Sequence, residues 1–261
     1  VTPGTLLEEN LLEEKSHNYV LAMEIRDKLV GLAYLDLSTG KFRLTETSRF
    51  ADALDEVRRI SPSEILLSVT VESLSIYSQL KTRLEGLYLT TIDQRDFEFS
   101  GAKQRLLDLF KTLSLEGFGC EDQKAAVCAA GAVLYYVRET QKQDVAHLAR
   151  IATYRLENHL LIDEISCRNL ELLRNIRSGG RGGTLLSVID KTVTAMGGRA
   201  LKQWLRCPLT DAAAIGARLD AVAEAKDALS LRGHLREQLQ SVFDLERLGS
   251  KIAMGQANAR D

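Results

Sequence analysis

Acidic side chains are spread through the first half of the chain, and a cluster of them could bind divalent metal ions. Two-metal nucleases place several carboxylates around a pair of ions, with an Asp near the middle of the first strand. The candidates here are Glu24, Asp36, Glu64, Asp93 and Asp96. Only Glu24 lies in the first expected strand, and the others fall where strands start or end, as turn-forming residues do. We expect structural roles for all five, with a metal-dependent nuclease as the alternative.

A glycine-rich stretch at residues 179–183 leads into an expected helix at Thr184. Backbone N–H groups at such a helix start could bind an anion. A phosphate-binding loop, however, needs Gly-Lys followed by Ser or Thr, and the only Gly-Lys pair, Gly40-Lys41, precedes Phe42. A Gly-x-Gly-x-x-Gly motif does not occur. We expect a flexible connection between helices and no cofactor in this chain.

Histidines and cysteines do not occur at metal-ligand spacings. The histidines stand alone, at His17, His147, His159 and His234. The cysteines form no close pair, at Cys120, Cys128, Cys167 and Cys207. A Gly-x-Ser-x-Gly nucleophile motif is also absent. The sequence therefore predicts neither catalytic residues nor metal ligands, and the cysteines are expected to be small buried apolar residues.

Arginines in the second half could contact DNA phosphates without reading the base sequence. They are Arg168, Arg174, Arg177, Arg181, Arg199 and Arg206. Acidic residues are interspersed among them, namely Asp163, Glu164, Glu171 and Asp190. Mixed charge is typical of a solvated helical surface, so a general DNA-binding module is kept as a second alternative with weak affinity.

Composition places these residues in a globular protein. The chain has 261 residues, 45% of them hydrophobic and 27% charged, with a net charge of −2. This length predicts two domains at roughly 100–200 residues each. No apolar run approaches the roughly 18 residues of a membrane-spanning helix. The chain starts at Val1 without a signal-peptide pattern and stops at Asp261 inside an expected helix, so we expect a cytoplasmic protein and a piece of a longer one.

Charge and secondary-structure pattern divide the chain at nearly the same place. Residues 1–125 contain 15 Lys and Arg against 21 Asp and Glu, a net charge of −6. Residues 126–261 contain 19 against 15, a net charge of +4. We therefore expect one domain over residues 1–125 and a second over residues 126–261.

The first domain is predicted to be α/β, a mixed sheet with flanking helices. Apolar runs and alternation predict strands at residues 19–26, 29–37, 41–45, 63–68 and 87–92. Apolar stripes at helical spacing predict helices at residues 50–60, 74–84 and 102–113. The resulting order, βββαβαβα, is similar to the ribonuclease-H-like topology.

The second domain is predicted to be mostly helical, without strands. A long helix at residues 122–140 is expected to bridge from the first domain into the second. The other helices are expected at residues 163–175, 184–191, 198–206, 211–229, 231–239 and 244–254, with Asp211 and Asp244 as possible N-caps.

Several runs in the second half resemble the MutS family of DNA mismatch-repair proteins. They are LIDEISCRNLEL at 161–172, TLLSVID at 184–190, TVTAMGGR at 192–199 and LKQWLRCPL at 201–209. The resemblance extends outward to VTPGT at 1–5, GFG at 117–119, DLER at 244–247 and GQANARD at 255–261. Essentially the whole chain is covered, in the family's order.

The resemblance implies the connector domain, followed by an incomplete first segment of the helical core and lever domain. In this family the connector has a ribonuclease-H-like fold without nuclease activity. It passes allosteric signals between the mismatch-binding and ATPase domains. The family's mismatch wedge belongs upstream of Val1, and its DNA clamp and ATP- and Mg-binding ATPase belong downstream of Asp261. The resemblance therefore implies a non-enzymatic fragment, which would meet mismatched duplex DNA and dimerise through absent domains.

The resemblance also implies a surface for the partner protein MutL on the connector. We expect this surface near the start of the helix at 102–113, at Lys103, Gln104 and Arg105. Ordinary solvated helix residues are the competing interpretation. In the second half, Gly197, Gly198, Arg199 and Trp204 are expected to serve helix geometry and packing.

Overall fold

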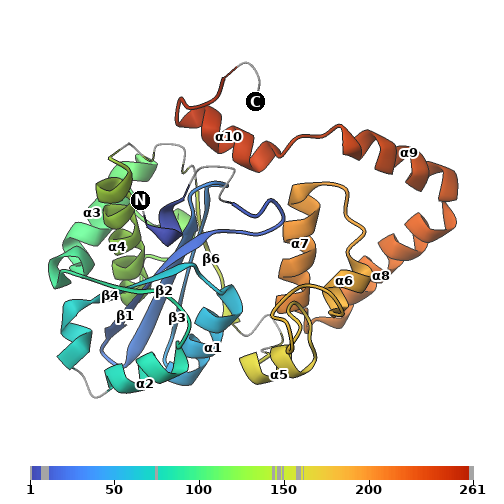
Figure 1. The fold of residues 1–261 in the computed structure, drawn as a ribbon. Helices are drawn as coiled ribbons and strands as arrows, with labels where there is room; N and C mark the ends of the chain where they lie inside the picture. Colours follow the sequence, from blue (N-terminus) through green and yellow to red (C-terminus); the bar gives the residue numbers. More distant parts are fainter. Residues whose placement is uncertain are drawn as a thin grey trace. The chain divides into compact units, whose positions relative to one another are not determined.

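The computed structural model describes residues 2–6, 12–73, 76–142, 145, 148, 150–156, 160 and 162–258. The chain forms two compact units (Figure 1). The first comprises Val1–Leu12, His17–Leu156 and Glu246–Asp261, and the second comprises Glu13–Ser16 and Glu157–Leu245. The predicted fold class, an α/β domain followed by a mostly helical region, is confirmed.

The first unit is built on a six-stranded mixed sheet of order β5-β4-β1-β2-β3-β6. The strands are β1 (Tyr19–Arg26), β2 (Leu29–Asp36), β3 (Lys41–Thr47), β4 (Glu64–Ser68), β5 (Leu89–Ile92) and β6 (Ile151–Thr153). Strands β1, β2 and β3 form an antiparallel meander. The pairs β1–β4, β4–β5 and β3–β6 are parallel.

The turn between β1 and β2 has the two residues that the sequence predicts. Asp27 and Lys28 have φ angles of 50° and 66°, the left-handed values that a tight hairpin requires at both central positions. The turn sets the register, in which Arg26 pairs with Leu29 and Tyr19 with Asp36. As a result β1 and β2 pair along their full length.

Helices cover both faces of this sheet, because alternate residues of the central strands point in opposite directions. On one face, Val20 and Ala22 of β1 belong to a core with α3 (Phe99–Phe110) and α4 (Lys124–Gln141). On the other face, Leu21 and Met23 belong to a core with α1 (Phe50–Ile60) and α2 (Ile76–Arg83). The central strands are therefore apolar on both sides.

Helix α4 lies unusually close to β2. A Cβ atom at Gly31 would be 2.0 Å from the carbonyl carbon of Ala125, so only glycine fits there. The Glu46 carboxylate of β3 accepts hydrogen bonds from the backbone N–H groups of Ala125 (2.8 Å) and Ala126 (3.3 Å). These bonds satisfy two N–H groups at the helix start, where no intrahelical acceptor exists.

The first unit continues to Leu156, beyond residue 125, where charge and pattern place the domain boundary. Helix α4 packs on its sheet, and β6 adds an edge strand that the sequence analysis does not predict. Three residues are too few to show alternation, and β6 is a strand because Phe42, Arg43 and Leu44 pair with it.

The second unit contains five helices among the described residues. They are α5 (Glu164–Asn169), α6 (Leu185–Ile189), α7 (Ala195–Arg206), α8 (Ala212–Asp227) and α9 (Leu229–Gln240). Helix α10 (Leu245–Ala253) follows and lies almost wholly in the first unit. Helix α5 is much shorter than the predicted 163–175, since the chain turns at Leu170 and Glu171 has a φ of 46°. Among the described helices, none is long and apolar enough to span a bilayer.

Candidate functional site

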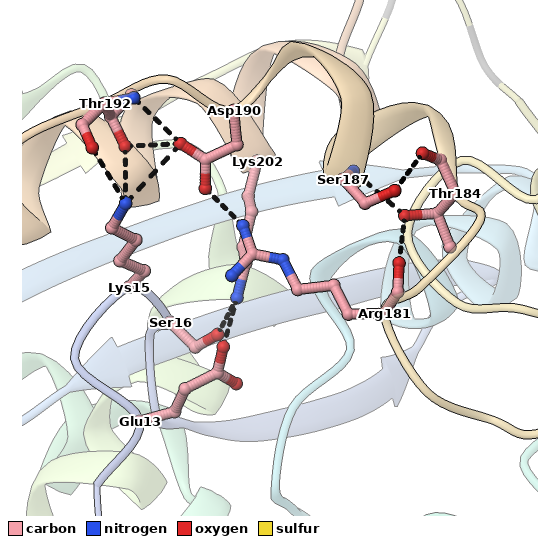
Figure 2. A network of polar contacts seen from close by, with 9 residues as sticks. All are labelled: Glu13, Lys15, Ser16, Arg181, Thr184, Ser187, Asp190, Thr192 and Lys202. Atoms are coloured by element: carbon pink, nitrogen blue, oxygen red, sulfur yellow. Dashed lines mark hydrogen bonds and ion pairs between the residues drawn. The ribbon is translucent and has the colours of Figure 1, made fainter.

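A polar network of the second unit surrounds Asp190, the residue that ends α6 (Figure 2). Its carboxylate accepts hydrogen bonds from the backbone N–H (3.0 Å) and the hydroxyl (2.5 Å) of Thr192. It also forms ion pairs with Arg181 and with Lys15, whose Nζ is 3.5 Å away. Burial alone would raise the pKa of Asp190, but these donors and cations outweigh burial and lower it to about 2.

The Glu13–Ser16 segment is bound to α7 and to the loop before it. Lys15 donates to the carbonyl oxygen (3.0 Å) and the hydroxyl (2.9 Å) of Thr192. Lys202 of α7 donates to the Glu13 carboxylate (2.7 Å) and to the Ser16 hydroxyl, as Figure 2 shows. A Cβ atom at Gly198 would lie 2.6–2.8 Å from Lys15 side-chain atoms, so the segment lies directly against the start of α7.

Arg199 is the most deeply buried cation in this arrangement, with 1% of its side chain exposed. Its guanidinium donates two parallel hydrogen bonds to Asp244, at 2.6 and 2.7 Å. It also donates to the Glu14 carbonyl oxygen at 2.9 Å. A planar guanidinium suits such a bidentate contact, and Nη1, which bonds one Asp244 oxygen, also donates to the Glu14 carbonyl oxygen.

The network positions chain segments, because the donors and acceptors just described satisfy one another. Thr184 caps α6 by accepting from the Ser187 N–H (3.1 Å), and its hydroxyl donates to the Arg181 carbonyl oxygen (2.7 Å). The sequence analysis does not identify Lys15, Lys202 or Thr192. Lys15 and Thr192 are 177 residues apart, so no local spacing could indicate this contact.

The arginines proposed for DNA contact are not equivalent. Arg168, Arg174, Arg177 and Arg181 are exposed, Arg206 is half-buried, and Arg199 is buried. Arg199 and Arg181 form ion pairs with Asp244 and Asp190. The structure therefore does not gather the six arginines into one free basic surface.

The glycine-rich stretch forms a tight turn centred on Asn175. The Asn175 carboxamide oxygen accepts from the N–H groups of Arg177 (2.9 Å) and Ser178 (3.2 Å). Gly179 and Gly183 have φ angles of 65° and 80°, which glycine adopts without strain. The stretch connects α5 to α6, and local hydrogen bonds define the turn before it.

The acidic residues considered for a nuclease site have separate partners. Glu64 is fully buried and accepts from Gly4 N–H (3.0 Å), Thr90 (2.7 Å) and Tyr136 (2.6 Å). Asp36 is bound by Ser38 and lies 2.6 Å from His17 Nδ1. Within the described part of the chain, no group of three or more His, Cys, Asp or Glu side chains could hold a metal ion.

The remaining acidic candidates also lie apart. Asp93 caps a short 3-10 helix at Gln94–Phe97 and pairs with Arg95, and Asp96 lies within that helix. Glu24 is 4% exposed, and Arg26 Nε lies 3.7 Å from its carboxylate. Burial raises the pKa of Glu24 to about 7 against the opposing effect of Arg26.

The histidines and cysteines differ in their exposure to solvent. His234 is exposed on α9, and His147 and His159 lie outside the described residues. Cys120, Cys128 and Cys207 are buried and Cys167 is half-buried, all with free thiols. Burial raises the pKa of Cys120 and Cys128 to about 11, which keeps these thiols protonated at neutral pH.

The three residues expected at a partner surface lie on α3, but only Gln104 is exposed. Lys103 forms an ion pair with Glu121, and Gln104 donates to Asp108 at 2.7 Å. Arg105 is half-buried, and its Nε donates to the Gly131 carbonyl oxygen of α4 at 3.1 Å. Arg105 thus connects α3 to α4, a packing role that the sequence analysis does not identify.

Comparison with known proteins gives matches along nearly the whole chain. Residues 18–149 match the family model described as MutS domain II, and residues 166–261 match MutS domain III. A DNA mismatch repair protein MutS from Desulforapulum autotrophicum is 47% identical over all of this chain. Proteins of the same name from Desulfosudis oleivorans and Desulfatibacillum aliphaticivorans are 44% and 45% identical, also over the full chain. The chain spans only 29–30% of the length of these curated relatives.

Proposed function

The chain belongs to the MutS family of DNA mismatch-repair proteins, and we propose that it is a non-catalytic part of such a protein. In this role it transmits allosteric signals between a mismatch-binding domain and an ATPase domain. The observation that carries the proposal is the succession of MutS domain II and MutS domain III along one chain. The separate structural partners of Glu64, Asp36 and Arg199 support a non-catalytic role.

Nucleotide binding, mismatch contact and dimerisation are proposed to belong to other domains of a longer protein. We propose that ATP and Mg are bound, mismatched duplex DNA is contacted and homodimers form through domains outside this chain, in the cytoplasm. Exposed apolar side chains on two helices of the second unit support a larger assembly. Leucine and valine side chains are exposed along α8 at Leu219 and Val222 and along α9 at Leu231, Leu235 and Leu239. We propose that other segments of a longer polypeptide cover these helices.

Assays on the purified chain test the non-catalytic role. We expect no release of phosphate from ATP, with or without mismatched duplex, and at most weak duplex binding without preference for a mismatch. Tight mismatch-selective binding or ATP turnover would contradict the proposal. Cleavage stimulated by Mg²⁺ or Mn²⁺ and lost on Asp36→Asn would favour the nuclease instead. A steep loss of duplex affinity with salt would favour a general DNA-binding module.

We further propose that α3 offers a surface to MutL around the exposed Gln104. Charge reversal at Arg105 would disturb the contact with α4, so Gln104→Arg is the cleaner change. We expect this variant to capture MutL at least about tenfold more weakly in biolayer interferometry, as the loss of one well-placed contact would give.

The matched control is Lys81→Glu, which changes an exposed residue on α2. The control should leave MutL capture unchanged, and circular dichroism should show both variants folded. Equal capture by the wild-type chain and Gln104→Arg would remove α3 from the proposed surface.

A further inference from the structure

We propose that Arg199 couples two segments of the second unit, so that the Glu13–Ser16 segment and Asp244 are each bound more firmly when the other is in place. A single buried guanidinium contacts both segments. It donates to the Glu14 carbonyl oxygen at 2.9 Å and to the two Asp244 oxygens at 2.6 and 2.7 Å. The coupling is a property of this chain alone and does not depend on MutL or on DNA.

Burial makes these two contacts interdependent. With 1% of its side chain exposed, Arg199 has almost no access to water while both partners are in place, so its guanidinium depends on them for hydrogen bonds. If Asp244 departs, the buried guanidinium loses the carboxylate that pairs with it in two hydrogen bonds, which disfavours the arrangement that also binds Glu14. The Asp244 side chain is 21% exposed, so water can hydrate it more easily than Arg199 when the two separate.

The Glu13–Ser16 segment also has anchors that do not involve Asp244. Lys15 bonds to Thr192 and pairs with Asp190, and Lys202 bonds to Glu13. The segment can therefore be loosened at Lys15 without touching Arg199 or Asp244. The shared guanidinium provides a route by which such a change can reach Asp244 and the residues after it.

The path of the chain explains why this coupling matters. The Glu13–Ser16 segment belongs to the second unit, whereas His17 begins the long first-unit stretch. Asp244 lies at the other end of the second unit, and Glu246 returns the chain to the first unit. Arg199 thus contacts the Glu13–Ser16 segment and Asp244, the two places where the chain leaves the second unit. Loosening of one of these contacts weakens the other. By thermodynamic reciprocity, the loss of Asp244 weakens binding of the Glu13–Ser16 segment by the same free energy as the loss of that segment weakens binding of Asp244.

Hydrogen exchange of the intact chain, read by mass spectrometry, tests the coupling. The Ser16 N–H donates to the Glu13 carbonyl oxygen at 3.1 Å and reports on the segment, and the α10 amides report on the residues after Asp244. We expect Asp244→Asn to speed Ser16 exchange about tenfold or more, the change that follows from unpairing a buried charge. We expect Lys15→Met to speed exchange both at Ser16 and in α10.

An Arg199→Met background gives the deciding comparison. In that background Lys15→Met should still loosen Ser16 but should no longer change α10. If Lys15→Met speeds Ser16 exchange and leaves α10 unchanged when Arg199 is present, the coupling is refuted. Unchanged Ser16 exchange in a folded Asp244→Asn chain would refute it equally.

Gly198→Ala provides a second route that leaves Arg199 and Asp244 chemically intact, in case Asp244→Asn does not fold. Its Cβ would lie 2.6–2.8 Å from Lys15 side-chain carbons, including Lys15 Cβ, so the segment must move. We expect faster exchange at Ser16 and in α10. Gly216→Ala, the same change in α8 with no neighbouring atom within 4 Å, is the matched control and should alter neither region. Loosening of Ser16 alone by Gly198→Ala would overturn the proposal.

Discussion

Buried carboxylates of the first unit differ in how fully they are hydrogen-bonded. Glu64 accepts bonds from three donors on three different parts of the chain, Gly4, Thr90 and Tyr136. Glu24 is nearly as buried, yet Arg26 Nε, the ion-pair atom nearest to it, is 3.7 Å away. Burial outweighs the opposing effects of Arg26 and Gln94 on the charged form of Glu24, and so raises its pKa to about 7.

This raised pKa predicts a pH-dependent stability. Between the usual pKa of 4.5 and the folded value of about 7, the folded chain binds more protons at Glu24 than the unfolded chain does. Stability therefore falls as pH rises through this window, by roughly 3 kcal/mol for this one group. Glu24→Gln should remove this pH-dependent contribution. The free energy of unfolding of the variant should therefore rise relative to that of the wild type as pH rises.

Urea unfolding at pH 5, 6, 7 and 8 measures the difference between Glu24→Gln and the wild-type chain. Glu85→Gln, at an exposed position, is the control and should follow the wild-type curve. A Glu24→Gln chain whose stability changes with pH just as the wild type does would show that Glu24 is already well compensated.

At the scale of elements, hairpins and amphipathic helices were predictable because their signals are local. The turn at Asp27 and Lys28 and helix α1 at Phe50–Ile60 agree with the predictions. The end of α3 was not predictable. Apolar spacing extends the helix to residue 113, but Lys111 adopts a φ of 51° and the helix stops at Phe110. Which residue turns left-handed at a helix end depends on the contacts beyond it.

The close packing of α4 on β2 predicts a severe effect of Gly31→Ala. The added methyl group would overlap backbone atoms of Ala125 and Ala126, which cannot move without displacing α4. We expect a loss of about 3 kcal/mol or more in the free energy of unfolding, at the upper end of overpacking effects. Chemical denaturation followed by far-UV circular dichroism measures this loss.

Gly117→Ala is the control, because no atom lies within 4 Å of the Cβ that it would add. It should change the free energy of unfolding by no more than about 0.5 kcal/mol, as surface substitutions do. A Gly31→Ala chain as stable as Gly117→Ala would mean that α4 can shift away from β2 at little energetic cost.

At the scale of the whole chain, the two units have very different cores. The first unit has two extensive apolar cores, one on each face of its sheet. In the second unit, α8 and α9 have no buried residue among those described. Helices of this length are marginal without an apolar face packed against another element. We therefore expect the second unit to unfold first.

Trp204 makes this expectation measurable, because it is the only tryptophan of the chain and lies in α7 of the second unit. The Arg218 guanidinium of α8 lies 4.0 Å from its ring centroid, so Trp204 fluorescence reports on the contact of these helices. On urea titration we expect the fluorescence midpoint to lie below that of far-UV circular dichroism.

Repeating both titrations at several chain concentrations controls for association through the exposed apolar side chains. Coincident transitions would indicate two-state unfolding of the entire chain and would contradict the predicted order.

The sequence by itself determined the features that depend on neighbouring residues. Alternation and helical spacing predicted the meander and most helices, and the family resemblance followed from runs such as 192–199 and 201–209. A helix in the region of α3 was also predicted, but it begins at Phe99 and not at residue 102, and the packing role of Arg105 was not predicted.

Only the tertiary structure decided which distant residues meet. It brought Lys15 to Thr192 and Arg199 to Asp244 and Glu14, and it extended the first unit to Leu156 by pairing β6 with β3. The physical reason is that periodicity reports which side of an element is apolar, whereas an ion pair or an edge strand depends on how the whole chain folds back on itself. Such contacts leave no spacing in the sequence from which they could be read.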